Sequence, residues 1–124
     1  MLSSNNITCM VPTRDSSKAK GFYEGVLGLT VESEDQFALV LRAKNLTVRV
    51  VKVAELTPQP FTLLGWDVEN VAESVSKLAG RGVVFERFAG MEQDELGIWT
   101  VPGAGHRVAW FKDPDGNLLS VSGA

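Results

Sequence analysis

Residues 113–116 read Asp-Pro-Asp-Gly, which is a strong signal for a tight turn. The proline presets the backbone for the second turn position, the aspartate side chains can accept hydrogen bonds from nearby N–H groups, and the glycine tolerates a positive φ. Apolar segments flank the turn, so we predict a β-hairpin over residues 107–121. Phe111 and Leu119 are expected on its buried face, and strand alternation then turns Ser120 to the opposite face.

The rest of the chain indicates one β-α-β-β-β unit that occurs twice. In each copy a strand precedes an amphipathic helix, and glycine ends the helix before further strands follow. A helix covers only one face of such a curved sheet, so two units must enclose a core, a ligand or an interface between their bare faces. The expected strands are 7–11 (closed by Pro12), 29–31, 37–42 and 46–53 in the first copy, and 61–68, 83–88 and the hairpin strands in the second, with helices between Ser16 and Gly28 and between Asn70 and Gly80.

Length and composition predict a single domain over residues 1–124. The chain is 44% hydrophobic and 22% charged, which is the balance of a globular protein with a proper core. Prolines interrupt the pattern at 54–60, which we interpret as a connector. The predicted modules are therefore about 7–53 and about 61–122.

Charge and targeting signals restrict the partners. The net charge is −3 and the basic residues are scattered, so we expect no nucleic-acid partner. No apolar run is long enough for a membrane span, and no signal peptide is visible, so we predict a cytoplasmic protein without a membrane partner. The lone Cys9 fits a reducing compartment and a place in the first strand.

Four segments carry a resemblance that spans nearly the whole chain. They are Phe-Tyr-Glu-Gly-Val-Leu-Gly-Leu at 22–29, Trp-Asp-Val-Glu-Asn-Val at 66–71, Gly-Arg-Gly-Val at 80–83 and Phe-Lys-Asp-Pro-Asp-Gly-Asn at 111–117. These segments resemble the vicinal oxygen chelate superfamily, which includes glyoxalase I, bleomycin resistance proteins, fosfomycin-modifying enzymes and extradiol dioxygenases. The resemblance implies an α+β fold in which two βαβββ modules form a curved mixed-sheet cup with the helices outside.

Enzymes of this superfamily hold a divalent metal in the cup through His, Glu or Gln. Carried over to this sequence, the ligand positions fall at about Thr8, 49–51, Leu63 and Ser120, and none of these is a usual ligand. We therefore predict no metal and no other cofactor. Two routes to a metal stay open: His106 shared between two subunits, or a hard cation held by Glu92, Asp94 and Glu95.

The predicted function is metal-independent binding of a small apolar or aromatic molecule, as in antibiotic sequestration by bleomycin resistance proteins. The resemblance to these proteins also implies a homodimer. Trp99 follows a polar segment, where the superfamily carries a loop over the cup, and is expected to be a pocket wall. Trp66 is expected under the helix, and Trp110 fits either face. The predicted apolar wall consists of Met10, Val51, Leu63 and Trp99, and the predicted hydrogen-bonding residues are Arg49, His106 and Ser120.

Two alternatives remain. One is a metal-dependent lyase or dioxygenase of the same superfamily whose metal site the sequence does not reveal, so whether a reaction is catalysed stays open. Separately, His106 is a candidate general base, oriented by Asp94 or Glu92, because imidazole titrates near neutral pH. The other alternative is an interaction module in which side chains fill the cup.

Overall fold

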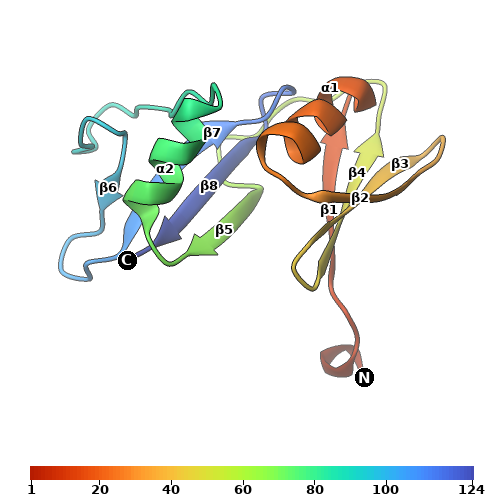
Figure 1. The fold of residues 1–124 in the computed structure, drawn as a ribbon, viewed down its shortest axis with the longest axis horizontal. Helices are drawn as coiled ribbons and strands as arrows, with labels where there is room; N and C mark the ends of the chain where they lie inside the picture. The colour runs from red at the N-terminus through yellow and green to blue at the C-terminus, as the bar shows by residue number, and fades with distance from the viewer. The chain divides into compact units, whose positions relative to one another are not determined.

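A computed structural model describes all 124 residues and divides the chain into two units, Met1–Thr57 and Pro58–Ala124. Each unit contains one four-stranded mixed sheet and one main helical segment (Figure 1). The strand orders are β1-β4-β3-β2 and β5-β8-β7-β6, so the second unit repeats the topology of the first. The α+β class and the twofold βαβββ pattern predicted from the sequence are confirmed.

In the first unit, β4 lies between its neighbours, parallel to β1 and antiparallel to β3. Its buried core lies on one face of the sheet, where alternate residues of β1, β3 and β4 are buried and α1 packs against β3 and β4. The elements are a short 3₁₀ turn Leu2–Ser4, β1 Thr8–Thr13, α1 Ser16–Lys20, the π-helical continuation Gly21–Val26, β2 Thr30–Glu34, β3 Ala38–Ala43 and β4 Leu46–Lys52.

Two details of the first unit differ from prediction. Pro12 does not close β1, which continues to Thr13. Because β1 is an edge strand, the missing proline N–H costs no hydrogen bond of the ladder. The expected α-helix begins after Asp15, which caps it by accepting a hydrogen bond from the N–H of Lys18 (3.1 Å), but its second half is a wider π-helix. That turn still buries Tyr23, and the segment ends at Gly28, whose φ is 81°.

In the second unit, α2 packs against β7 and β8 and lies across one face of the sheet (Figure 1). Asn70 caps the helix by accepting from the N–H of Glu73 (3.0 Å). The central strand β8 runs parallel to β5 and antiparallel to β7. The elements are β5 Leu64–Val68, α2 Val71–Gly80, β6 Trp99–Thr100, β7 Arg107–Lys112 and β8 Leu118–Gly123.

The hairpin predicted over residues 107–121 is confirmed. Phe111 is paired with Leu119, and Trp110 is paired with Ser120. In the turn, the N–H of Asp113 donates to the carbonyl of Asn117 and the N–H of Gly116 donates to the carbonyl of Asp113, both at 3.0 Å. The hairpin therefore supplies the two inner strands of the second sheet.

The predicted strand at 83–88 is wrong. Only one bridge forms there, between Phe85 and Phe111. The edge strand that pairs with β7 is instead the two-residue β6. The reason is a side chain: Gln93 accepts from the N–H of Phe88 (2.8 Å) and donates to the carbonyl of Glu86 (2.9 Å). Backbone groups that a strand would use are bonded to an amide side chain.

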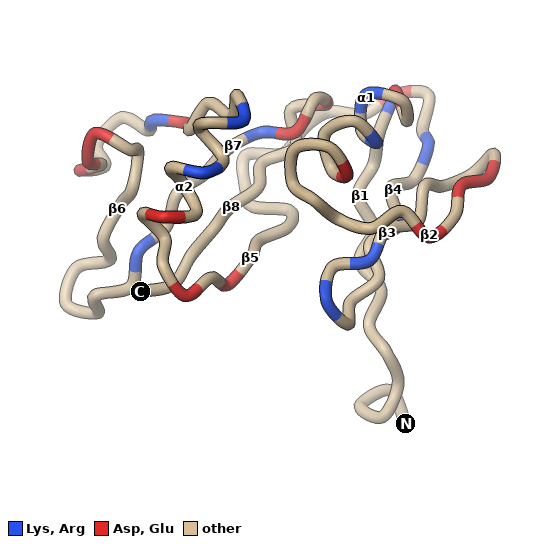
Figure 2. The backbone as a smooth tube through the Cα atoms, in the orientation of Figure 1, with Lys and Arg blue, Asp and Glu red and all other residues tan.

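Charges of both signs are distributed along the chain, with Lys and Arg in blue and Asp and Glu in red in both units (Figure 2). Several of them pair locally, including Lys52 with Glu34 (2.9 Å) and Arg42 with Glu32 (2.9 Å) in the first unit. None of the helices has both the length and the apolar character needed to span a membrane.

Asp35, in the turn between β2 and β3, carries a carboxylate with a perturbed pKa. Its Oδ1 accepts hydrogen bonds from the N–H groups of Phe37 (2.7 Å) and Ala38 (2.9 Å). These bonds lower the pKa of Asp35, and the nearby cations Arg49 and Lys52 lower it further. Since the folded pKa lies below the unfolded one, the contribution of Asp35 to stability is full above about pH 4 and is lost as pH falls through the folded pKa.

We therefore expect Asp35→Asn to reduce the acid sensitivity of folding. The difference between the urea midpoints at about pH 6 and about pH 2.5 should be smaller than in the wild type, because the variant has no carboxylate to protonate there. Thr30→Ala, an uncharged change at an exposed position of β2, is the control and should keep the wild-type difference. Equal pH differences in Asp35→Asn and the wild type would contradict the assignment.

Candidate functional site

Each sheet has a face that its helical segment does not cover. In the first unit, the parallel register pairs Met10 with Arg49 and Pro12 with Val51. Their neighbours Val11 and Val50 point into the core. Strand alternation therefore places Met10, Arg49 and Val51 together on the helix-free face of the first sheet. Met10 is 55% exposed there, while Arg49 and Val51 are half-buried.

The helix-free face of the second unit carries Ser120. The residue is 8% exposed and pairs with Trp110 on one side and Gly65 on the other. A Cβ on Gly65 would lie 2.7 Å from Ser120 Oγ, so this hydroxyl occupies the space that the glycine leaves open. By the same alternation Leu63, which is 38% exposed and directly precedes β5, belongs to this side.

An aromatic row is the main feature of this second face. The ring centroids of Trp99 and Trp110 are 6.1 Å apart, and those of Trp110 and Phe88 are 5.4 Å apart in an edge-on arrangement. The indole N–H of Trp110 donates to Oγ1 of Thr62 (3.1 Å), which fixes the orientation of the central ring. Both indoles are half-buried and Phe88 is 37% exposed, so the row is open to a ligand.

Trp66 lies on the opposite face, as predicted. It pairs with Val121 and stacks against the fully buried Phe111 at a centroid distance of 6.4 Å. Trp66 therefore belongs to the core beneath α2 and not to the aromatic row.

The segment before β6 is held by side chains that bond to backbone. Asp94 Oδ1 accepts from the N–H groups of Leu96 and Ile98, both at 2.9 Å, and Asp94 Oδ2 lies 3.7 Å from Arg107 Nη2. Gln93 also donates to the carbonyl of Gly97 (2.9 Å). These bonds direct the chain from the polar segment into β6, where Trp99 pairs with Val108.

His106 lies in the exposed turn between β6 and β7, where its carbonyl accepts from the N–H of Val101 (2.7 Å). The partners of Asp94 are backbone amides and Arg107, and not the imidazole. The structure therefore places Asp94 as a turn cap rather than as the residue that orients a histidine base.

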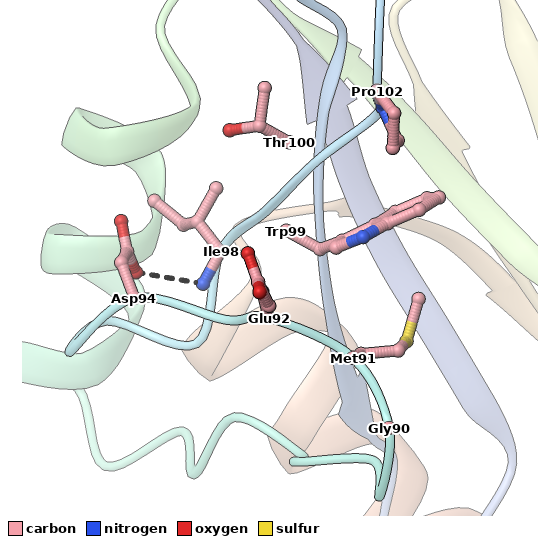
Figure 3. A pocket seen from close by; sticks show the side chains of 8 residues that line it. All are labelled: Gly90, Met91, Glu92, Asp94, Ile98, Trp99, Thr100 and Pro102. Atoms are coloured by element: carbon pink, nitrogen blue, oxygen red, sulfur yellow. Dashed lines mark hydrogen bonds between the residues drawn. The ribbon is translucent and has the colours of Figure 1, made fainter.

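A hollow of about 620 Å³ opens beside Trp99 in the second unit (Figure 3). Of its lining, the sequence predicted only Trp99 as a ligand contact. The sequence did not predict Phe88 or Thr62, the hydrogen-bond partner of Trp110, as part of the site, and it left the face of Trp110 open, although alternation with the buried Phe111 could have assigned it. The lining consists of Gly90, Met91, Glu92, Asp94, Ile98, Trp99, Thr100 and Pro102.

The donor atoms do not fit a resident metal. Nowhere in the structure do three or more His, Cys, Asp or Glu side chains gather where they could hold an ion. Of the positions that the resemblance assigns to ligands, Thr8 and Ser120 offer hydroxyls and Leu63 offers only methyl groups. Asp94, one member of the acidic set considered for a hard cation, is occupied by backbone amides.

Comparison with known proteins agrees with this fold. The family model for the Glyoxalase/Bleomycin resistance protein/Dioxygenase superfamily matches residues 7–121. The chain belongs to this superfamily. No curated protein matches the sequence.

Solved structures of the superfamily resemble the chain over its whole length. A member from Sphaerobacter thermophilus DSM 20745 is 20% identical, covers 100% of both chains and has a TM-score of 0.76. TnmS3, an antibiotic binding protein from Streptomyces sp. CB03234, is 24% identical over 99% of this chain and 98% of its own, with a TM-score of 0.74. A lactoylglutathione lyase from Agrobacterium tumefaciens is 14% identical over 98% of this chain and 94% of its own, with a TM-score of 0.74.

Proposed function

We propose that this superfamily member binds a small, partly aromatic organic molecule without the help of a metal. The observation that carries the proposal is the aromatic row Phe88, Trp110 and Trp99 on the helix-free face of the second sheet. Flat rings offer large contact area at little conformational cost and stack readily with aromatic ligands. A cavity of a few hundred cubic ångströms beside the row is in the range of small-molecule sites.

The predicted site residues fit this role. In the second unit, Trp99 and Leu63 supply apolar surface, and the Ser120 hydroxyl supplies a hydrogen-bonding group on the same face. In the first unit, Met10 and Val51 supply apolar surface and Arg49 supplies hydrogen-bond donors. His106 stands in the exposed β6–β7 turn, where it can contact a ligand from the rim. Their roles as ligand contacts are part of the proposal.

Metal independence is supported by donor chemistry. Transition metals need several N, O or S ligands, and the assigned positions carry hydroxyl groups, methyl groups and the guanidinium of Arg49 instead. The similar fold of TnmS3, an antibiotic binding protein, shows that this architecture serves binding in another chain. We further propose a cytoplasmic homodimer, the assembly that the resemblance to bleomycin resistance proteins implies, and sedimentation equilibrium would measure the assembly.

A lyase is the second candidate, because a lactoylglutathione lyase shares the fold. The two functions differ in their dependence on metal. Elemental analysis of the purified protein, followed by binding titrations with and without EDTA, separates them. Stoichiometric metal, or binding that EDTA abolishes, would favour the enzyme over the metal-independent binder.

We expect Trp99→Ala to weaken the binding of an aromatic ligand at least tenfold, because truncation removes about 1.4 kcal/mol or more of stacking and contact. Titration calorimetry with 1-naphthalenemethanol as the probe, alongside tryptophan fluorescence, measures the affinity. Trp66→Phe is the control, since Trp66 lies on the other face, and it should retain both the affinity and the ligand-dependent quenching. Loss of affinity in Trp66→Phe alone would place the site elsewhere.

A further inference from the structure

We propose that the ligand carries a positive charge: the hollow beside Trp99 selects an organic cation, an ammonium group on an aromatic or apolar body. The inference rests on the proposed function and specifies its ligand class. The hollow combines an indole, a thioether and a carboxylate within one cavity, from Trp99, Met91 and Glu92 (Figure 3).

The carboxylate of Glu92 is the uncompensated charge at this site. Glu92 is exposed and makes neither a hydrogen bond nor an ion pair in the structure. The other acid of the lining, Asp94, is satisfied by two backbone amides and faces Arg107 at 3.7 Å. The cation Arg87 is directed to the carbonyl of Glu95 (2.7 Å). The hollow therefore keeps one negative charge for a ligand to neutralise.

The apolar part of the lining suits a soft cation. An indole face attracts ammonium groups through its quadrupole, and a thioether is polarisable. Figure 3 shows the Glu92 side chain between Ile98 and Trp99, with Met91 below the indole. Because Glu92, Trp99 and Pro102 line the same hollow, we expect an alkylammonium group to bind near the carboxylate while its organic body lies against Trp99 and Pro102.

The same lining disfavours the other charge classes. An inorganic divalent cation needs about six oxygen ligands, and one free carboxylate beside an indole does not supply them. An anion would be repelled by Glu92 and would find no unpaired cation in the lining, which contains no Lys or Arg. The segment that leads into β6 is also predominantly acidic (Figure 2).

Three naphthalene probes that differ in charge test the inference: 1-naphthylmethylammonium, 1-naphthalenemethanol and 1-naphthaleneacetate. Titration calorimetry should give about fivefold or greater preference for the cation over the alcohol, and the acetate should bind weakest. Raising the salt concentration from about 0.05 to 0.5 M should weaken binding of the cation and leave the affinity for the alcohol unchanged, because salt screens only the charged contact.

Matched variants locate the charge. Glu92→Gln should reduce the affinity for the cation about fivefold and leave the affinity for the alcohol unchanged. Glu95→Gln is the same change in the same segment but outside the lining, and it should leave both affinities unchanged. Circular dichroism confirms that both variants are folded. Equal affinities for cation and alcohol, or equal losses in Glu92→Gln and Glu95→Gln, would overturn the inference while leaving the proposed function intact. If none of the three probes binds, the proposed function falls together with the inference.

Discussion

Replacing Phe111 by alanine is expected to lower the free energy of unfolding by about 3–5 kcal/mol, the range for truncation of a buried aromatic side chain. Phe111 is fully buried in the second unit. Its ring lies 5.6 Å from that of Phe85 and 6.4 Å from that of Trp66. The cavity left by the ring removes these contacts together with the burial of the phenyl group.

Urea unfolding monitored by circular dichroism measures this loss. Phe37→Ala is the matched control: it is the same substitution at a position that is 65% exposed, and it should change stability by less than about 0.5 kcal/mol. The emission of Trp66 should also change in native Phe111→Ala, because its stacking partner is gone. Similar unfolding midpoints for the two alanine variants would show that Phe111 is not central to the core.

Asp113→Ala is expected to cost about 2–4 kcal/mol, because it leaves several donors of the hairpin turn without an acceptor. Asp113 is 6% exposed. Its Oδ1 accepts from the N–H groups of Asp115 (2.9 Å) and Asn117 (3.0 Å), and its Oδ2 accepts from the side-chain amide of Asn117 (3.0 Å). Alanine removes all three bonds and exposes the turn to alternative conformations.

Exchanging Asp113 and Asn117 tests the hydrogen bond between their side chains. Asp113→Asn places an amide opposite the amide of Asn117. Adding Asn117→Asp restores a donor opposite an acceptor, so the double variant should recover part of the lost stability. Pro114→Ala, at an exposed position of the same turn, is the control and should have a much smaller effect. If Asp113→Ala unfolds at the same urea concentration as Pro114→Ala, the carboxylate does not stabilise the turn.

The fold was largely predictable because its signals are local. The turn chemistry at 113–116 identified the hairpin, and the glycines that follow the two helices, such as Gly28, helped to mark the two repeats. The strand expected at 83–88 failed for a non-local reason, since Gln93 bonds to the backbone of Glu86 and Phe88. A two-residue strand such as β6 leaves no periodic pattern to detect.

The candidate site was predictable to the extent that strand alternation determines it. Because Phe111 and Leu119 were assigned to the core, Ser120 was correctly predicted on the other face. In the structure, the parallel register places Met10, Arg49 and Val51 on one face of the first sheet. The hollow beside Trp99 was not predictable in this way. Its form depends on the bonds that Gln93 and Asp94 make to the backbone of the following residues, and such bonds follow no sequence period.

The strand order has a consequence for how the protein is made. In each sheet the strand synthesised last, β4 or β8, is inserted between the first strand and the remaining pair. While the ribosome is still producing the segments in between, β1 or β5 has no hydrogen-bonding partner and presents a bare strand edge. Such edges promote aggregation of nascent chains. A chain interrupted before residue 118 would therefore be a substrate for chaperones or proteases.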